Sequence, residues 1–121
     1  MTAKRRDPAQ VAAALTAVLA ALDAGDRPAR NDLAPAVRGL ADRLAEAAPG
    51  RHVEVRIPPY AAVQCVAGPR HMRGTPPNVV EADPTTFVEL CVGRIAWTDA
   101  VRDGRVRTWG DRADLAAWLP L

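Results

Sequence analysis

The segment that decides the fold is His52-Val53-Glu54-Val55-Arg56-Ile57, in which polar and apolar residues alternate. A period of two is typical of a β-strand with one buried face. Pro58-Pro59 ends this run, and Tyr60–Ala67 resumes it as a second strand. The residues predicted to share one side of that second strand are Ala61, Val63, Cys65 and Ala67.

The sequence before this segment is helical in pattern. Asp7-Pro8 indicates a helix start, because Asp is a favoured N-cap and Pro fits the first helical position, and Gly25 is a plausible end. Asn31-Asp32 announces a second helix, which Pro49-Gly50 ends. The apolar stripes are Val11, Leu15, Val18, Leu19 and Leu22 in the first helix, and Leu33, Val37, Leu40, Ala41 and Leu44 in the second.

The sequence after the two strands mixes short elements with many turn residues. Gly68–Asn78 is predicted to be a loop and Val79–Ala82 a third strand. Asp83-Pro84 repeats the helix-start pattern, Thr98–Asp103 is a short helix, and Arg105–Trp109 is a strand. Asp111 is expected to cap a final helix that carries Leu115, Trp118 and Leu119. A helical first half followed by strands and mixed elements predicts the α+β class.

Composition narrows the partners and the compartment. The chain has 121 residues, which suits one domain, and a net charge of +2, which is too small to indicate a nucleic acid or an anionic membrane as partner. Lys4-Arg5-Arg6 before an apolar run resembles a signal peptide, but Asp7, Pro8 and Gln10 interrupt that run. The run is also too short and too weakly apolar for stable membrane insertion. We expect a cytoplasmic protein whose few large core side chains are Tyr60, Phe87, Trp97, Trp109 and Trp118.

No catalytic residue, metal site or cofactor is predicted. The sequence contains no serine, which excludes serine hydrolysis, and His52 and His71 have no ligand partners at metal spacing. Glu81 and Asp83 could form an acid–base pair, although Asp83 is already explained as a helix cap. Cys65 and Cys91 are expected to be buried core thiols, with a disulfide or a reactive thiol as the alternatives.

The segment from Asp83 to Leu121 resembles the C-terminal part of the sterol-carrier-protein type-2 superfamily. The residues that carry the resemblance are Asp83, Phe87, Gly93, Ala100, Gly104, Val106, Gly110, Asp111 and Leu115. Upstream, PPYAAVQCVAGPRHMRGTPPNVVEADP, from Pro58 to Pro84, is similar to the bacterial sterol carrier family branch, so the likeness covers roughly residues 31–121. The helix over Asp7–Leu22 lies outside it.

The resemblance implies a small, mostly antiparallel sheet of four or five strands covered by helices, with an apolar tunnel between the layers. Only two clear strands precede Val79–Ala82, so one edge of the usual five-stranded sheet is predicted to be short or missing. It also implies a single domain, with residues 1–30 as a helical extension and 31–121 as the core. The residues expected to line the tunnel or to form solid core are Val55, Ile57, Val63, Cys65, Val80, Phe87, Leu90, Val106, Leu115, Trp118 and Leu119.

Three polar residues, Arg70, His71 and Arg73, lie in the predicted loop beside the tunnel. They could hold the anionic head of a fatty acyl ligand, because Arg pairs well with carboxylate and phosphate. The alternative is a solvated loop.

The function implied by the resemblance is non-enzymatic binding or carriage of a lipid or other apolar ligand. Similar domains also form the C-terminal half of maleylpyruvate-isomerase-like, thiol-dependent enzymes, so an accessory domain or partner of such an enzyme is one alternative. A structural module that forms a homodimer through the first helix is another.

Overall fold

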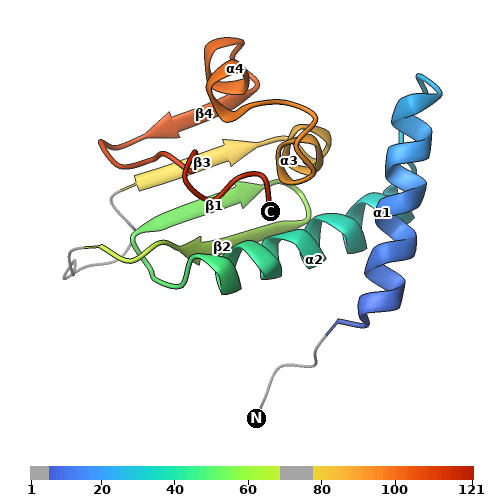
Figure 1. Ribbon diagram of the computed structural model, residues 1–121, viewed down its shortest axis with the longest axis horizontal. Coiled ribbons are helices and arrows are strands. Elements are labelled where there is room, and N and C mark those ends of the chain that lie inside the picture. Colours follow the sequence, from blue (N-terminus) through green and yellow to red (C-terminus); the bar gives the residue numbers. More distant parts are fainter. Residues whose placement is uncertain (1–5, 69–77) are drawn as a thin grey trace.

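The structure, a computed structural model, describes residues 6–68 and 78–121. It has the α+β class that the sequence predicts (Figure 1). The elements in chain order are α1 (Pro8–Asp23), α2 (Arg30–Ala47), β1 (Val53–Ile57), β2 (Ala61–Cys65), β3 (Asn78–Ala82), α3 (Pro84–Cys91), α4 (Trp97–Arg102) and β4 (Val106–Trp109).

The described strands form one four-stranded sheet in the order β2-β1-β3-β4. The β1–β2 and β3–β4 pairs are antiparallel, and the central β1–β3 pair is parallel, with Val53 opposite Asn78. The sheet is therefore mostly antiparallel, as expected, and takes the smaller of the two predicted strand numbers.

One face of the sheet forms the core. The alternation in β1 holds, since Val53, Val55 and Ile57 are fully buried while Glu54 and Arg56 are partly exposed. Helices α2 and α3 and the segment 111–121 cover this face, and the C-terminal segment crosses in front of the central strands (Figure 1). The buried face is thus the apolar face that the period of two predicts.

The opposite face of the sheet is polar. Glu54 pairs with Arg56 at 3.2 Å and Glu81 with Arg107 at 2.5 Å. Trp109, predicted to be a core residue, is 50% exposed on this face, opposite Val79. That prediction was wrong because β4 is an edge strand, and the register turns Trp109 away from the helices.

Helix α1 lies outside the two layers and packs on α2 (Figure 1). Asp7 caps it by accepting a hydrogen bond from the backbone N–H of Ala9. Gly25, at φ 73°, follows its C-terminus in the left-handed conformation that glycine adopts readily. Only part of the predicted apolar stripe is buried: Val18 is enclosed, while Leu15, Leu19 and Leu22 are partly exposed.

Several predicted boundaries need correction by one or two residues. Strand β3 begins at Asn78, α4 spans Trp97–Arg102 and β4 begins at Val106. Helix α2 begins at Arg30 with Ala29 as N-cap, so Asn31-Asp32 lies in its first turn. There the negative charge of Asp32 interacts favourably with the positive end of the helix dipole. Strand β2 ends at Cys65, and Ala67 is exposed instead of sharing the buried side. The strand ends there because the N–H of Val66 donates to the carbonyl of Ala48, which turns the backbone to φ 68°.

The predicted final helix does not form: residues 111–121 contain turns without helix or strand. The Asp114 carboxylate accepts a hydrogen bond from the N–H of Ala116, a local bond that competes with helix formation. A helix this short is also marginal by itself. The segment is held instead by Leu115, which is almost fully buried, and by the Leu121 N–H, which donates to the Cys91 carbonyl.

Candidate functional site

The residues predicted to line a tunnel come together in one place. They belong to, or pack against, a single apolar cluster between the sheet and its covering layer. The buried members are Val55, Ile57, Cys65, Val80, Phe87, Leu90, Val106 and Leu115, and the partly exposed members are Val63, Trp118 and Leu119. Arg70, His71 and Arg73 lie outside the described residues.

Two of these residues, Leu90 and Leu119, also line a pocket of about 260 Å³. We name it the α3–α4 pocket, because it lies between those helices and the C-terminal segment. Its lining consists of Leu90, Ile95, Ala96, Trp97, Thr98, Ala116, Leu119 and Pro120. None of these side chains is charged, so the pocket suits an uncharged, apolar group.

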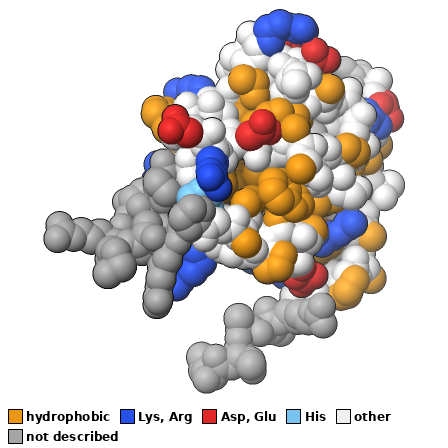
Figure 2. Space-filling view, turned by 60° about the vertical axis from the view of Figure 1, so that its left-hand side comes forward, with side chains coloured by type: hydrophobic (Ala, Val, Ile, Leu, Met, Phe, Trp, Pro, Cys, Tyr) orange, Lys and Arg blue, Asp and Glu red, His pale blue; other side chains and the backbone are white. Residues whose placement is uncertain are grey.

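One face of the molecule carries apolar surface. In the space-filling view, hydrophobic side chains gather near the middle of one face, with charged groups around them (Figure 2). Apolar surface of this kind is common where a protein meets an apolar ligand or another protein.

A second apolar hollow lies between α1 and α2 and measures about 330 Å³. We name it the α1–α2 groove. It is lined by Arg6, Pro8, Val11, Ala12, Leu15, Gly39, Leu40, Asp42, Arg43 and Glu46. Sequence reasoning missed this groove, because helical stripes show which face of a helix is apolar but not how far two helices diverge.

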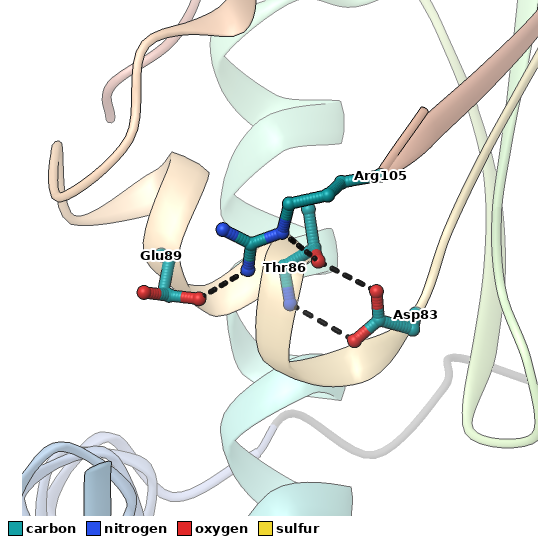
Figure 3. A network of polar contacts seen from close by, with 4 residues as sticks. All are labelled: Asp83, Thr86, Glu89 and Arg105. Atoms are coloured by element: carbon teal, nitrogen blue, oxygen red, sulfur yellow. Dashed lines mark hydrogen bonds and ion pairs between the residues drawn. The ribbon is translucent and has the colours of Figure 1, made fainter. Parts of the chain in front are cut away.

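A polar pocket of about 380 Å³ contains Glu81 and Asp83, the carboxylates weighed as an acid–base pair. Asp83 is the N-cap of α3 and accepts hydrogen bonds from the N–H and hydroxyl of Thr86 at 3.2 and 2.5 Å. Arg105 donates to the Thr86 hydroxyl and to Glu89, which ties the start of β4 to α3 (Figure 3). These contacts support the cap interpretation of Asp83, since its carboxylate is occupied in holding the helix.

Sequence reasoning missed a buried polar pair, formed by His52 before β1 and Asn78 at the start of β3. The Asn78 side-chain oxygen accepts from the Arg112 N–H at 2.9 Å, and its nitrogen donates to the His52 carbonyl at 3.2 Å. Because these two bonds orient the amide, its nitrogen also faces His52 Nε2, at 3.1 Å, as a donor. His52 Nε2 is then the acceptor, and Nδ1 has no partner among the described residues.

The surroundings of this pair are tightly packed. A methyl group on Gly68 would overlap the His52 ring, so glycine is required where the chain passes it. The neighbouring Val66 has φ 68°, a strained conformation for a β-branched residue. The only signal in the sequence was two polar residues beside strand starts, which does not reveal burial.

Both cysteines are free and buried, as the preferred interpretation of the sequence expects. Burial raises the pKa of Cys65 to about 11 and that of Cys91 to about 12. The thiolate is the nucleophilic form, so neither group is activated at neutral pH.

Within residues 6–68 and 78–121, no group of three or more His, Cys, Asp or Glu side chains could hold a metal ion. In the same ranges, no helix has the length and apolar character needed to cross a bilayer.

Comparison with known proteins identifies the family. The family model described as bacterial SCP ortholog matches residues 29–121, which include every described strand and α2, α3 and α4. No curated protein matches the chain significantly. Helix α1 lies outside the matched residues. The chain therefore belongs to the bacterial branch of the sterol carrier protein family.

Proposed function

We propose that this protein binds or carries a lipid or other apolar ligand and catalyses no reaction. Membership of the sterol carrier protein family supports a carrier role. The observation that carries the proposal is the α3–α4 pocket, whose lining is uncharged and includes Leu90 and Leu119 from the expected tunnel. Leu90 and Leu119 are thus common to this pocket and to the set of residues expected beside a tunnel.

The C-terminal segment offers a physical route for a ligand. Residues 111–121 belong to no helix or strand, so few backbone bonds hold them in place. Leu121 donates to Cys91, while Trp118 and Leu119 donate back to Leu115. Displacing such a segment requires less than unfolding a helix or strand. In the proposal, the segment moves aside and an apolar chain extends from the α3–α4 pocket toward Phe87 and Leu115.

The size of the pocket limits what it holds without movement. At about 260 Å³ it is slightly below the common range for ligand pockets, about 300–1,000 Å³. A larger ligand would therefore need the layer to open. We expect ligand binding to raise the melting temperature and to protect Leu115–Leu121 from hydrogen exchange.

The first test is native mass spectrometry of freshly purified protein. The second is titration with an alkane such as dodecane and with fatty acyl ligands, in which the melting temperature is measured. Ala116→Phe fills the α3–α4 pocket, whereas Ala117→Phe changes a neighbouring exposed alanine that is not part of its lining. We expect the first variant to lose ligand stabilisation and the second to keep it. Failure of the wild type to carry or bind any apolar ligand at saturation would refute the proposal.

The proposal also covers the domain organisation, the cellular compartment and the partners of the protein. Residues 31–121 would act as the carrier core and 1–30 as an extension. Two buried, unpaired thiols suit the reducing cytoplasm. A net charge of +2 gives no reason to expect nucleic acid as a partner. Mass measurement of the intact protein also tests whether it forms a homodimer.

A further inference from the structure

The α1–α2 groove is built from two helical faces. On α1 its lining residues Pro8, Val11, Ala12 and Leu15 recur at helical spacing. On α2 the matching face runs from Gly39 to Glu46, about 10 Å along the axis at 1.5 Å per residue. The two faces therefore form an elongated groove that is open to solvent along one side.

Gly39 is a point at which the two helices approach each other closely. A methyl group at this position would overlap the Val11 side chain, so the helices touch closely there. Beyond this contact the walls are apolar: Leu40 is almost fully buried in α2, and Leu15 is only partly buried on α1. The exposed part of Leu15 is apolar surface that a ligand could cover.

The charged residues of the groove differ in how they are satisfied. Arg6 donates to Asp42 at 2.8 Å, which neutralises both. Glu46 is engaged in an interaction of its own. Arg43 is exposed and makes no hydrogen bond or ion pair with another described residue, although its charge acts on Cys91, where it opposes the rise of the thiol pKa. The groove thus combines apolar walls with one cation whose hydrogen-bonding capacity is not used by described partners.

We infer that the α1–α2 groove binds a single-chain amphiphile with a carboxylate head. The alkyl chain lies between Val11 and Leu15 of α1 and Leu40 of α2, and the head accepts hydrogen bonds from the Arg43 guanidinium. This inference rests on the proposed function, because both assume that the protein binds an apolar ligand, but it concerns a different site. Helix α1 lies outside residues 29–121, which the family model matches, so the site would be an addition of this chain to the family domain.

The experiment uses the full chain, with dodecanoate and dodecanol as probes in isothermal titration. Ala12→Phe places a ring in the groove, and Ala13→Phe is its matched control, because Ala13 is an exposed neighbour on α1 outside the lining. Arg43→Gln removes the cation, and Arg27→Gln removes an exposed arginine from the α1–α2 connection. Circular dichroism confirms that each variant is folded.

If both proposals hold, the wild type shows two binding events for each probe; we expect Ala12→Phe to remove the event at the groove and to keep the event at the α3–α4 pocket, and Ala13→Phe to keep both. Arg43→Gln should weaken dodecanoate about tenfold, the equivalent of one charge-assisted hydrogen bond, and spare dodecanol. Arg27→Gln should affect neither. Equal loss of both probes in Arg43→Gln would overturn the carboxylate assignment.

The outcomes separate this inference from the proposed function. If Ala116→Phe abolishes binding and Ala12→Phe does not, the groove is not the site, and the proposed function stands. If the wild type binds neither probe, and also carries no lipid, both proposals fail. Loss in Ala12→Phe of a binding event that Ala116→Phe retains supports the groove.

Discussion

The two apolar contacts of this protein differ in how completely side chains fill them. Between the sheet and its covering layer, Val55, Phe87 and Leu115 are buried to 1% exposure or less. Between α1 and α2, Leu15 and Leu19 are only partly covered, and a groove of about 330 Å³ is left open. The closed contact lies inside the family match, and the open one involves the helix outside it.

The difference teaches how each contact is held. A closely packed layer is stabilised by burial, at about 1.5–3 kcal/mol for each large apolar side chain. Helix α1 buries Ala14 and Val18 in the core cluster and is held elsewhere at separate points: Arg6 pairs with Asp42, Val11 meets Gly39, and Asp23 accepts from Arg94 at 2.6 Å. Point contacts leave room for a ligand between them, whereas a filled layer must open to accept one.

The largest effect is expected in the closed layer. Phe87→Ala should lower the free energy of unfolding by about 3–5 kcal/mol, because it leaves a cavity among buried neighbours. Urea denaturation measures the change. The control Val101→Ala truncates a side chain that is 37% exposed on α4 and should change the free energy of unfolding by no more than about 0.5 kcal/mol. A cost below about 1 kcal/mol for Phe87→Ala would show that this layer is not closely packed.

The buried polar pair is the next test of the closed layer, because Asn78 links His52, before β1, to Arg112 in the C-terminal segment. Asn78→Ala should cost about 2–3 kcal/mol, because the Arg112 N–H, His52 carbonyl and His52 Nε2 lose their common partner. Equilibrium denaturation provides the measurement. Asn31→Ala, at an exposed position of α2, is the control and should be close to neutral. Equal effects of the two substitutions would contradict the pairing.

The α1–α2 contact is tested by whether Gly39→Ala raises or lowers the free energy of unfolding. Gly39→Ala would stabilise an isolated helix by about 1 kcal/mol. Here we expect a loss of about 1–3 kcal/mol, because the methyl group overlaps Val11. Adding Val11→Ala should restore much of this loss in a thermal denaturation series. A stabilising Gly39→Ala would mean that α1 is not docked at this point in solution.

The smallest effect is expected at the exposed ion pair. The hydrogen bond from Arg94 holds the pKa of Asp23 below its ordinary value of 3.8, so the pair stabilises the folded protein above that pH and ceases to do so as the pH falls below it. Asp23→Asn should therefore lower the melting temperature slightly at neutral pH, and the difference should vanish in strong acid or at high salt. Asp26→Asn is the exposed control. A difference that persisted in acid would point to another cause.

Local signals were enough for most elements. Asp7-Pro8 and Asp83-Pro84 begin helices as predicted, because capping depends on neighbours in the chain. The alternation at Val53, Val55 and Ile57 gave the buried face of β1 directly. The final helix was mispredicted because tertiary contacts hold this segment, namely the burial of Leu115 and the hydrogen bond from the Leu121 N–H to the Cys91 carbonyl, and no local pattern contains them.

The candidate site was only partly predictable. The apolar residues expected beside a tunnel do gather in one cluster, since periodicity identifies inward faces. Periodicity cannot show whether inward faces meet closely, so neither the α3–α4 pocket nor the α1–α2 groove could be derived from it. The orientation of Asn78 toward His52 arises from the parallel register of β1 and β3, which no local pattern contains.

That parallel register has a kinetic consequence. The β1–β2 hairpin and the α1–α2 pair join neighbouring segments, so each can form early at little loss of chain entropy. The β1–β3 pairing joins Val53 to Asn78 across the whole of β2 and the connection after it. Long-range pairing of this kind slows folding. Until β3 pairs with β1, this edge of the hairpin stays open. The arrival of β3 orients Asn78 toward His52, positions α3 and provides the edge on which β4 pairs.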